Sequence, residues 1–389
     1  MKTQVAIVGS GPAGLLLGHL LRQADLDVVI VERHTAEHVL SRIRAGVLET
    51  TATDLLERLG LDARMHAEGL VHTGFKLTDG ERMLRIDMEL LTGKHVMVYG
   101  QTEVTKDLID AAPNRGLEII WEAEDVTLHA VDSDSPHLGF TKAGEAHRID
   151  ARFIAGCDGF YGPSRRAFPE FVAREYELAY PFGWLGILAD VPPCDEELIY
   201  ANHEHGFALA SMRSHTRSRY YIQVPIDTTL TDWPDERIWD ELALRLGPQV
   251  AAGMARGPSI EKSIAPLRSF VFEPMRHGSL FLAGDAAHIV PPTGAKGLNL
   301  AASDVAYLSD ALICWFASGD TEGIDGYSER ALSRVWKSER FSWSLTNLMH
   351  RFPGGGAFER RMQVAELDYI AGSRAAQTAI AENYVGLPL

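Results

Sequence analysis

Three short segments containing glycine and aspartate, each at the end of an apolar stretch, are the parts of this sequence best suited to chemistry. The first, Gly9-Ser10-Gly11-Pro12-Ala13-Gly14, follows apolar residues 4–8 and precedes a helical pattern at 15–24. Gly9 allows a tight turn, Gly11 lets the backbone approach a pyrophosphate, and Gly14 lets the helix lie close to the strand. The helix N-terminus adds unpaired amides and the positive end of a dipole. The segment therefore predicts a dinucleotide site.

A second apolar stretch, 27–31, ends at Glu32, about 20 residues beyond the glycines, where a carboxylate accepts hydrogen bonds from ribose hydroxyls. Because the same fingerprint serves FAD and NAD, these two features alone do not separate a flavoprotein from an NAD-dependent dehydrogenase.

Two more strand ends favour the flavoprotein. Apolar residues 279–283 run into Gly284-Asp285, which places the Asp285 carboxylate where parallel sheets bind ligands and where ribityl hydroxyls would lie. A helix expected to begin near Gly297 would stabilise negative charge on a reduced flavin ring. Between these motifs, residues 154–157 lead into Asp158-Gly159. A dehydrogenase would leave the two Asp-Gly motifs without a purpose.

A hairpin is predicted from 206–213 and 219–224, joined by a polar turn at 214–218. Alternation along the strands places Ser211, Arg213 and Tyr221 on one surface. A guanidinium fork flanked by hydroxyls is well suited to a carboxylate. The hairpin alone equally allows Arg213 and Arg219 to form a solvated charged face.

The three motifs, in this order and spacing, resemble the class A flavoprotein aromatic hydroxylases. The likeness covers essentially the whole chain, including segments 42–49, 99–103, 197–202 and 381–388. It implies an α/β protein with a Rossmann-type FAD-binding fold, a β-sheet substrate domain and a helical C-terminal region. It also implies hydroxylation of 4-hydroxybenzoate to 3,4-dihydroxybenzoate, with NADPH and dioxygen as co-substrates.

The resemblance assigns roles by position. Ser211, Arg213 and Tyr221 would bind the carboxylate, and Tyr200 and the backbone carbonyl of Pro292 would meet the phenol. Tyr384 and His72 would extend a proton path to solvent, a role that suits the ordinary pKa values of tyrosine and histidine, about 10 and about 6.5. Residues expected to line or influence the flavin are Arg44, Gln101, Arg219, Asp285, Leu298 and Asn299. Asp158 is expected to contact both FAD and the nicotinamide cofactor.

The reductant is predicted from a second group of residues. Arg33 and Arg42 are two positive charges near Glu32 that could meet the 2′-phosphate of NADPH, unless they are only solvated surface charges. Arg268 occupies an expected pyrophosphate contact. By the same resemblance, His38 replaces an expected tyrosine and Tyr161 an expected histidine. We therefore expect NADPH to be preferred, with NADH less strongly excluded.

Composition narrows the remaining function classes. The net charge of −16 and the lack of a basic block argue against nucleic acid, and the widely spaced Cys157, Cys194 and Cys314 fit a reducing cytoplasm. We expect no membrane span, because no apolar run is long enough for one. We also expect no metal site, because His203 and His205 have no further ligand cluster. Aromatic residues in the helical C-terminal region favour packing or a homodimer contact.

Four regions are expected along the chain: an FAD-binding part at 1–180 with inserted strands around 73–97, a β-rich substrate domain at 181–266, a return to the FAD-binding part at 267–345, and a helical interface at 346–389. Two further alternatives stay open: a related hydroxylase for another hydroxybenzoate, and a non-catalytic flavin-binding sensor.

Overall fold

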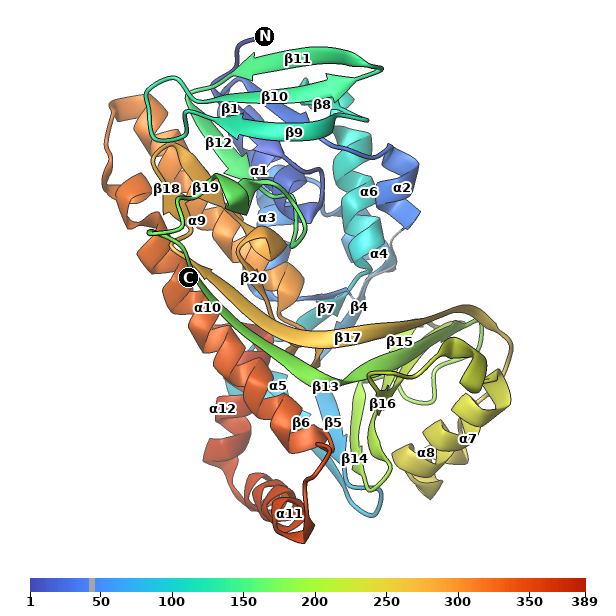
Figure 1. Ribbon diagram of the computed structural model, residues 1–389. Coiled ribbons are helices and arrows are strands. Elements are labelled where there is room, and N and C mark those ends of the chain that lie inside the picture. The colour runs from blue at the N-terminus through green and yellow to red at the C-terminus, as the bar shows by residue number, and fades with distance from the viewer. Residues whose placement is uncertain (42–45) are drawn as a thin grey trace.

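The computed structural model describes residues 1–41 and 46–389 (Figure 1). Arg42 and Arg44, both expected at the cofactor, lie outside the described residues. Within them, the strands form two large sheets and two small ones, and helices cover the larger sheets. The mixed α/β class predicted from the sequence is confirmed.

A six-stranded sheet brings the predicted motifs together. Its order is β18-β19-β12-β1-β2-β8, with bounds Arg276–His277, Leu280–Leu282, Phe153–Gly156, Val5–Val8, Val28–Val31 and Glu118–Ile120. All neighbouring pairs from β19 to β8 are parallel. Because parallel strands end at a common edge, the turns after β1, β2, β12 and β19 gather there.

The second large sheet has eight strands. Its order is β20-β17-β13-β16-β15-β14-β5-β6, with bounds His288–Ile289, Ser259–Glu273, Arg174–Ala189, Arg217–Pro225, Gly206–Ser214, Ile199–His203, Gly74–Thr78 and Met83–Asp87. The long antiparallel strands β13 and β17 run between the upper and lower parts of the molecule in Figure 1. Strand β13 crosses the boundary expected between residues 180 and 181, and β17 crosses the one expected between residues 266 and 267.

Two three-stranded sheets complete the strands that the structure describes. One is β11-β10-β9 (Glu145–Asp150, His137–Lys142 and Glu124–His129), and the other is β3-β7-β4 (Val47–Leu48, Val96–Val98 and Leu70–His72).

The helices surround these sheets. Those at the N-terminal side are α1 Pro12–Gln23, α2 Ala36–Ser41, α3 Thr50–Leu59, α4 Ala63–Glu68, α5 Met88–Thr92 and α6 Gln101–Ala111. The later ones are α7 Asp235–Leu246, α8 Pro248–Ala251, α9 Gly297–Ser318, α10 Glu322–Met349, α11 Ala357–Gly372 and α12 Arg374–Val385. Figure 1 shows α10 passing alongside both parts of the molecule.

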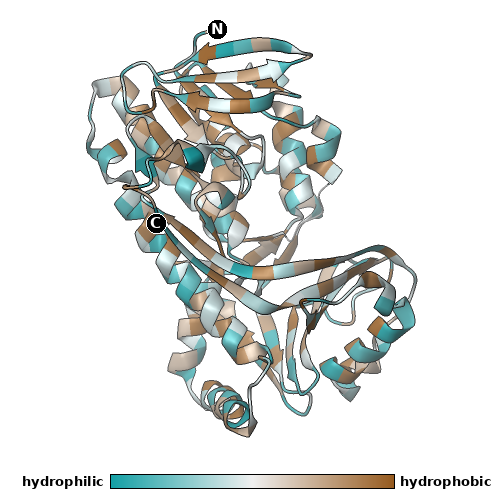
Figure 2. Ribbon diagram, viewed as in Figure 1, coloured by the Kyte–Doolittle hydropathy of each residue, from teal (hydrophilic) through white to brown (hydrophobic). Residues whose placement is uncertain are grey.

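Hydrophobic residues explain why these elements pack. The strand β1 is completely buried between β2 and β12, which accounts for its uninterrupted apolar sequence. In Figure 2, helix α7 carries hydrophilic and hydrophobic residues on different sides, and Ile238, Trp239 and Leu242 are the buried ones. One described helix, α9, is long and apolar enough to cross a membrane, but 61% of its apolar window is buried inside the fold.

Candidate functional site

The glycine turn after β1 leaves space for a ligand at one position. Gly9 has φ +101°, and a Cβ there would lie 2.5 Å from the Cys157 carbonyl oxygen. A Cβ on Gly14 would lie 2.0 Å from the Gly9 oxygen, so Gly14 serves packing of helix against strand. In contrast, a Cβ on Gly11 would meet no atom within 4 Å. The open side of Gly11, at an α1 N-terminus without a side-chain cap, is therefore suited to a pyrophosphate.

The Glu32 carboxylate is held in place at the end of β2. Its Oε2 accepts a hydrogen bond of 2.9 Å from the Ser10 amide, and its Oε1 accepts one of 3.0 Å from the His34 amide. Oε2 also accepts from the Ser10 hydroxyl at 3.2 Å, so Oε1 is the oxygen that keeps a lone pair for a ribose hydroxyl.

The Asp158 carboxylate lies beside this turn with one oxygen unused. Its Oδ2 accepts a 2.8 Å hydrogen bond from the Ser164 amide, while its buried Oδ1 has no partner among the described residues. Burial raises the pKa of Asp158. A buried oxygen without a partner is costly, and a ligand hydroxyl would satisfy it.

The predicted flavin end is built by the start of α9. The helix begins at Gly297, as expected, and Lys296 before it provides no side-chain cap, so the first amides stay available. Asp285 is exposed in the turn after β19, Leu298 is half-buried, and Gln101 begins α6. The open glycine turn, the unused Asp158 oxygen and the uncapped α9 together fit FAD.

The Asn299 side chain has a structural task. Its amide nitrogen donates to the Val47 carbonyl oxygen at 2.8 Å, and its oxygen accepts from the Glu49 amide at 2.8 Å. It thereby ties β3 to α9, and its second amide hydrogen is used by the Ala295 carbonyl oxygen at 2.9 Å.

The predicted hairpin is confirmed, with a shorter turn. In β15 and β16, Ser211 pairs with Arg219 and Leu209 with Tyr221, so these residues share a face. Pairing continues to Ser214 and Arg217, and a register irregularity falls between Met212 and Ser214, at Arg213.

The two arginines of the hairpin differ in their electrostatic partners. Arg219 is 5% exposed and donates to the Glu261 carboxylate at 2.7 and 3.2 Å. Arg213 is half-buried, and no carboxylate among the described residues forms an ion pair with it. Burial lowers the pKa of Arg213, and Tyr221 contacts it. A solvated charged face, the open alternative, is wrong, because Arg219 is buried and Arg213 is half-buried.

A pair of buried tyrosines lies on the same face of the sheet. The hydroxyl oxygens of Tyr200 on β14 and Tyr384 on α12 are 2.8 Å apart, and both side chains are about 1% exposed. Burial raises the pKa of Tyr200 to about 12 and that of Tyr384 further above its usual range. The Tyr384 ring stacks on Phe75, with centroids 4.2 Å apart.

His72 ends β4 and is 2% exposed, and its two ring nitrogens have no partner in the described part of the chain. Burial lowers its pKa, while the carboxylates of Glu197, Asp195 and Glu196 oppose that shift. The same carboxylates, with the neighbouring Thr73, line a surface hollow of about 570 Å³. His72 itself does not line the hollow, and it reaches it only through its neighbour Thr73 in the chain.

The residues expected at the nicotinamide cofactor are less enclosed. Arg33 and His38 are exposed, and Tyr161 is 73% exposed. The Arg268 guanidinium lies 4.6 Å from the ring centre of Phe160 and 3.4 Å from the Glu177 carboxylate. These side chains are accessible to a large soluble ligand.

Several contributing residues have no local signal in the sequence. Glu261 pairs with Arg219 across 42 residues. Trp184 donates a 2.7 Å hydrogen bond to His350 and lies 5.1 Å from Tyr221, between ring centres. Lys296 is buried, donates to Glu49 and, at 3.0 Å, to the Tyr384 carbonyl oxygen. Only folding brings these partners together.

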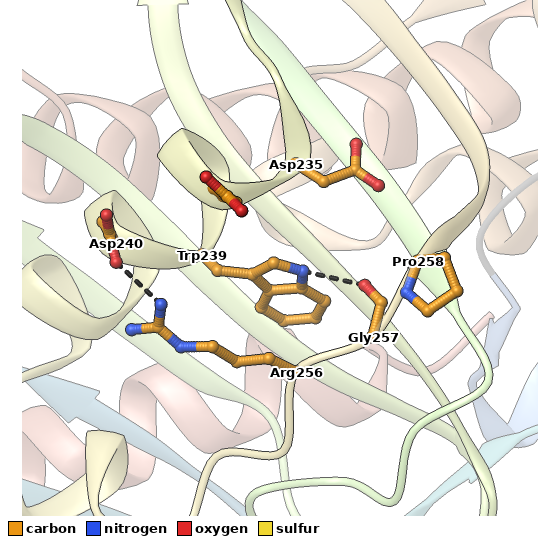
Figure 3. Close-up of a pocket in the computed structure, with 7 residues that line it drawn as sticks. Asp235, Trp239, Asp240, Arg256, Gly257 and Pro258 are labelled. Carbon is orange, nitrogen blue, oxygen red and sulfur yellow. Dashed lines mark hydrogen bonds and ion pairs between the residues drawn. The ribbon is translucent and has the colours of Figure 1, made fainter.

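The hollow shown in Figure 3 is unrelated to this chemistry. It has a volume of about 520 Å³ and lies beside α7. Trp239 donates to the Gly257 carbonyl oxygen at 2.9 Å, and Arg256 pairs with Asp240 at 2.7 Å. These two contacts hold the wall of the hollow together, and none of the residues predicted for the reaction lines it.

Comparisons with known proteins agree with this geometry. A family described as "FAD binding domain" matches residues 2–342. A p-hydroxybenzoate hydroxylase from Acinetobacter baylyi is 57% identical over 389 residues, all of this chain and 96% of the relative. A para-nitrophenol 4-monooxygenase from a Pseudomonas species is 25% identical, covering 83% of this chain and 81% of its own. The crystal structure of a p-nitrophenol 4-monooxygenase from Pseudomonas putida aligns over 100% of both chains with a TM-score of 0.84 at 18% identity.

Proposed function

We propose a substrate and a set of residue roles from the premise that this chain belongs to the FAD-binding family of flavoprotein aromatic hydroxylases. It is an FAD-dependent monooxygenase, and its substrate is 4-hydroxybenzoate, which it converts to 3,4-dihydroxybenzoate. The observation that carries the substrate is the pairing of an uncompensated, half-buried Arg213 with a buried Tyr200–Tyr384 hydroxyl pair on one sheet. A benzoate carrying a phenol at its far end matches both.

Arg213 binds the carboxylate with both arms of its guanidinium, and the hydroxyls of Ser211 and Tyr221 fill the remaining lone pairs. Arg219, already neutralised by Glu261, does not compete for the substrate charge. Through this ion pair Arg219 stabilises the hairpin, and it contributes to the placement of the flavin.

Tyr200 accepts a hydrogen bond from the substrate phenol. The phenol proton passes through Tyr200 to Tyr384 and toward His72. Because burial keeps both tyrosines protonated near neutral pH, they relay a proton without carrying a lasting negative charge. The Pro292 carbonyl oxygen accepts from the same phenol. When bound, FAD would supply the redox and oxygen-activating chemistry, with NADPH as the reductant and dioxygen as the source of the oxygen atom. The enclosing sheet excludes water, so that the oxygen reaches the activated ring.

NADPH is the proposed reductant. Arg33 meets its 2′-phosphate, and Arg268 meets its pyrophosphate. The exposure of Arg33 and of Tyr161 supports an open binding surface, with NADH less strongly excluded.

The same proposal extends to the rest of the molecule. We place the protein in the cytoplasm as a homodimer, with the exposed Phe358, Met362 and Tyr369 of α11 among the apolar residues available for a contact. The four regions predicted from the sequence remain our division of the chain.

The test is NADPH oxidation by the purified flavoprotein across a panel of benzoates, with the aromatic product and hydrogen peroxide both measured. We expect 4-hydroxybenzoate to stimulate oxidation most and to give 3,4-dihydroxybenzoate with little peroxide. If 3-hydroxybenzoate or a dihydroxybenzoate gives more product and less peroxide per NADPH, that compound is the substrate instead of 4-hydroxybenzoate. If no benzoate stimulates NADPH oxidation, a non-catalytic flavin-binding protein is favoured.

A further inference from the structure

A group of buried polar atoms between α10 and the large sheet has no role in the reaction described above. Four side-chain atoms there have no well-formed hydrogen bond in the part of the chain that the structure describes: Tyr180 Oη, Ser269 Oγ, Glu339 Oε1 and Ser342 Oγ. The Ser269 hydroxyl is nevertheless close enough to Tyr180 and Glu339 to act on the pKa of each. Ser269 pairs with Leu178 in the β13–β17 ladder, two residues from Tyr180, and it influences both Tyr180 and Glu339. Buried polar groups of this kind are normally satisfied, which makes the group a natural place for internal water.

Glu339 is the titratable member of this group. It is 4% exposed, and burial raises its pKa to about 7, against the opposing effects of Ser269, His288 and the Phe270 amide. The groups that face it are the Tyr180 hydroxyl from β13, Ser269 from β17 and His288 from β20. His288 is itself held by Asp304 of α9 at 2.6 Å. No described lysine or arginine forms an ion pair with Glu339. A carboxyl that is buried without a cationic partner favours its neutral form more than an exposed one does.

The same face of α10 supports the loop that carries Pro292. The Thr346 hydroxyl donates to Thr293 at 2.9 Å, and a Cβ added to Gly294 would lie 2.3 Å from Ser342 Oγ. Ser342 is three residues after Glu339, so both lie on one side of the helix. On the other side of the loop, Ile289 pairs with Phe270, the residue whose amide contacts Glu339. Both ends of the loop are thus linked to the surroundings of one carboxyl.

We propose that Glu339 is a positioning residue whose protonation sets the placement of the Pro291–Gly294 loop. In its neutral form Glu339 lets α10 and β17 close on the loop and fix the Pro292 carbonyl oxygen. When it ionises, it must be hydrated, and water entering beside Ser342 and Gly294 loosens the loop. The proposal rests on the proposed function, because it takes Pro292 as a contact of the substrate phenol.

The experiment uses the FAD-loaded enzyme and Glu339→Gln, which keeps the side-chain shape and cannot ionise. Infrared difference spectra between about pH 6 and about pH 8 should show one buried carboxyl losing its proton, and this signal should be missing in the variant. The flavin absorption without substrate should shift over the same range in the wild type only. With 4-hydroxybenzoate, the peroxide formed per NADPH should rise about threefold from the acidic to the basic limit in the wild type and stay at the acidic value in the variant.

Glu329→Gln is the matched control, because Glu329 is an exposed residue of the same helix. It should behave as the wild type in all three measurements. Ser269→Ala provides a second variant if Glu339→Gln does not fold. Removing a hydroxyl that favours the ionised carboxylate should move the infrared and flavin transitions to higher pH.

The proposal is overturned if Glu339→Gln keeps the wild-type pH dependence of the flavin spectrum, or if Ser269→Ala leaves the transition unmoved. Failure of the proposed function is a separate result. If 4-hydroxybenzoate is not hydroxylated at any pH, the infrared and flavin measurements still decide whether Glu339 titrates and whether its ionisation reaches the flavin site.

Discussion

Arg213 and Arg219 lie on one hairpin, yet only Arg219 has a carboxylate partner in the described structure. If Arg213 anchors the substrate, Arg213→Ala removes a charge-assisted fork and weakens 4-hydroxybenzoate binding about 100-fold, or about 2.7 kcal/mol. The dissociation constant follows from the substrate-induced change in flavin absorption. Arg217→Ala is the control, since Arg217 is an exposed residue of the same hairpin that pairs with Asp190. Equal affinity in the Arg213 variant and the control would assign the carboxylate to another residue.

A second prediction at the scale of a single residue concerns Arg33 and the selectivity for NADPH over NADH. It is exposed directly after Glu32, the residue proposed to bind ribose, so it can meet a 2′-phosphate without leaving a buried charge unpaired. Arg33→Ala should lower kcat/KM for NADPH about tenfold and leave NADH nearly unchanged. The wild type should still prefer NADPH. A preference for NADH in the wild type, or an unchanged ratio in the variant, removes Arg33 from the selectivity argument.

At the scale of elements, His350 connects the end of α10 to strand β13. Its ring accepts a hydrogen bond from Trp184 at 2.7 Å, lies 3.0 Å from the Thr346 carbonyl oxygen, and stacks on Phe207 with centroids 4.3 Å apart. The acceptor role requires the neutral ring with its proton on Nδ1. Burial lowers the pKa of His350 from 6.5 to about 3.

A depressed histidine pKa gives stability that is present above pH 6.5 and is lost as pH falls toward about 3, because the unfolded chain binds the proton first. His350→Phe removes this titration and the Trp184 hydrogen bond. The wild type should therefore be more stable near pH 7.5, and its advantage should shrink by about 2 kcal/mol by about pH 5. Urea denaturation at both pH values measures the difference, with the exposed His95→Phe as control. A constant advantage would show that His350 does not titrate in this range.

The elements that could be predicted are those with local signals. The strands before Gly9, Asp158 and Gly284 are short apolar runs ending in glycine turns, and the 206–224 hairpin shows period-two alternation around a polar turn. The crossing strands β13 and β17 were not predicted, because their pairing joins residues 174–189 to 259–273. The ion pair of Glu261 was not predicted for the same reason, because its partner Arg219 lies 42 residues earlier in the sequence.

At the scale of the whole molecule, the site exists only because distant segments converge. The Tyr200–Tyr384 hydrogen bond joins residues 184 positions apart, and Asn299 reaches back to Glu49. Composition and periodicity do not encode such distances, so these positions were predicted through the family resemblance. The comparisons confirm the family.

Removal of FAD tests how the whole fold depends on its cofactor. Gly11 leaves open space and has an extended backbone with φ −69°, so Gly11→Ala should not disturb the protein itself. If the pyrophosphate approaches Gly11 as predicted, the added methyl occupies its position. The apo form of Gly11→Ala should melt at the wild-type apo temperature, yet gain little on adding FAD. At FAD 100 times above its dissociation constant, the wild type should gain about 2.7 kcal/mol. Gly14→Ala is the contrasting variant, because its Cβ would lie 2.0 Å from the Gly9 oxygen and should lower the stability of the apo form directly. Equal stabilisation of wild type and Gly11→Ala by FAD, measured by thermal melting with and without the cofactor, would place the pyrophosphate elsewhere.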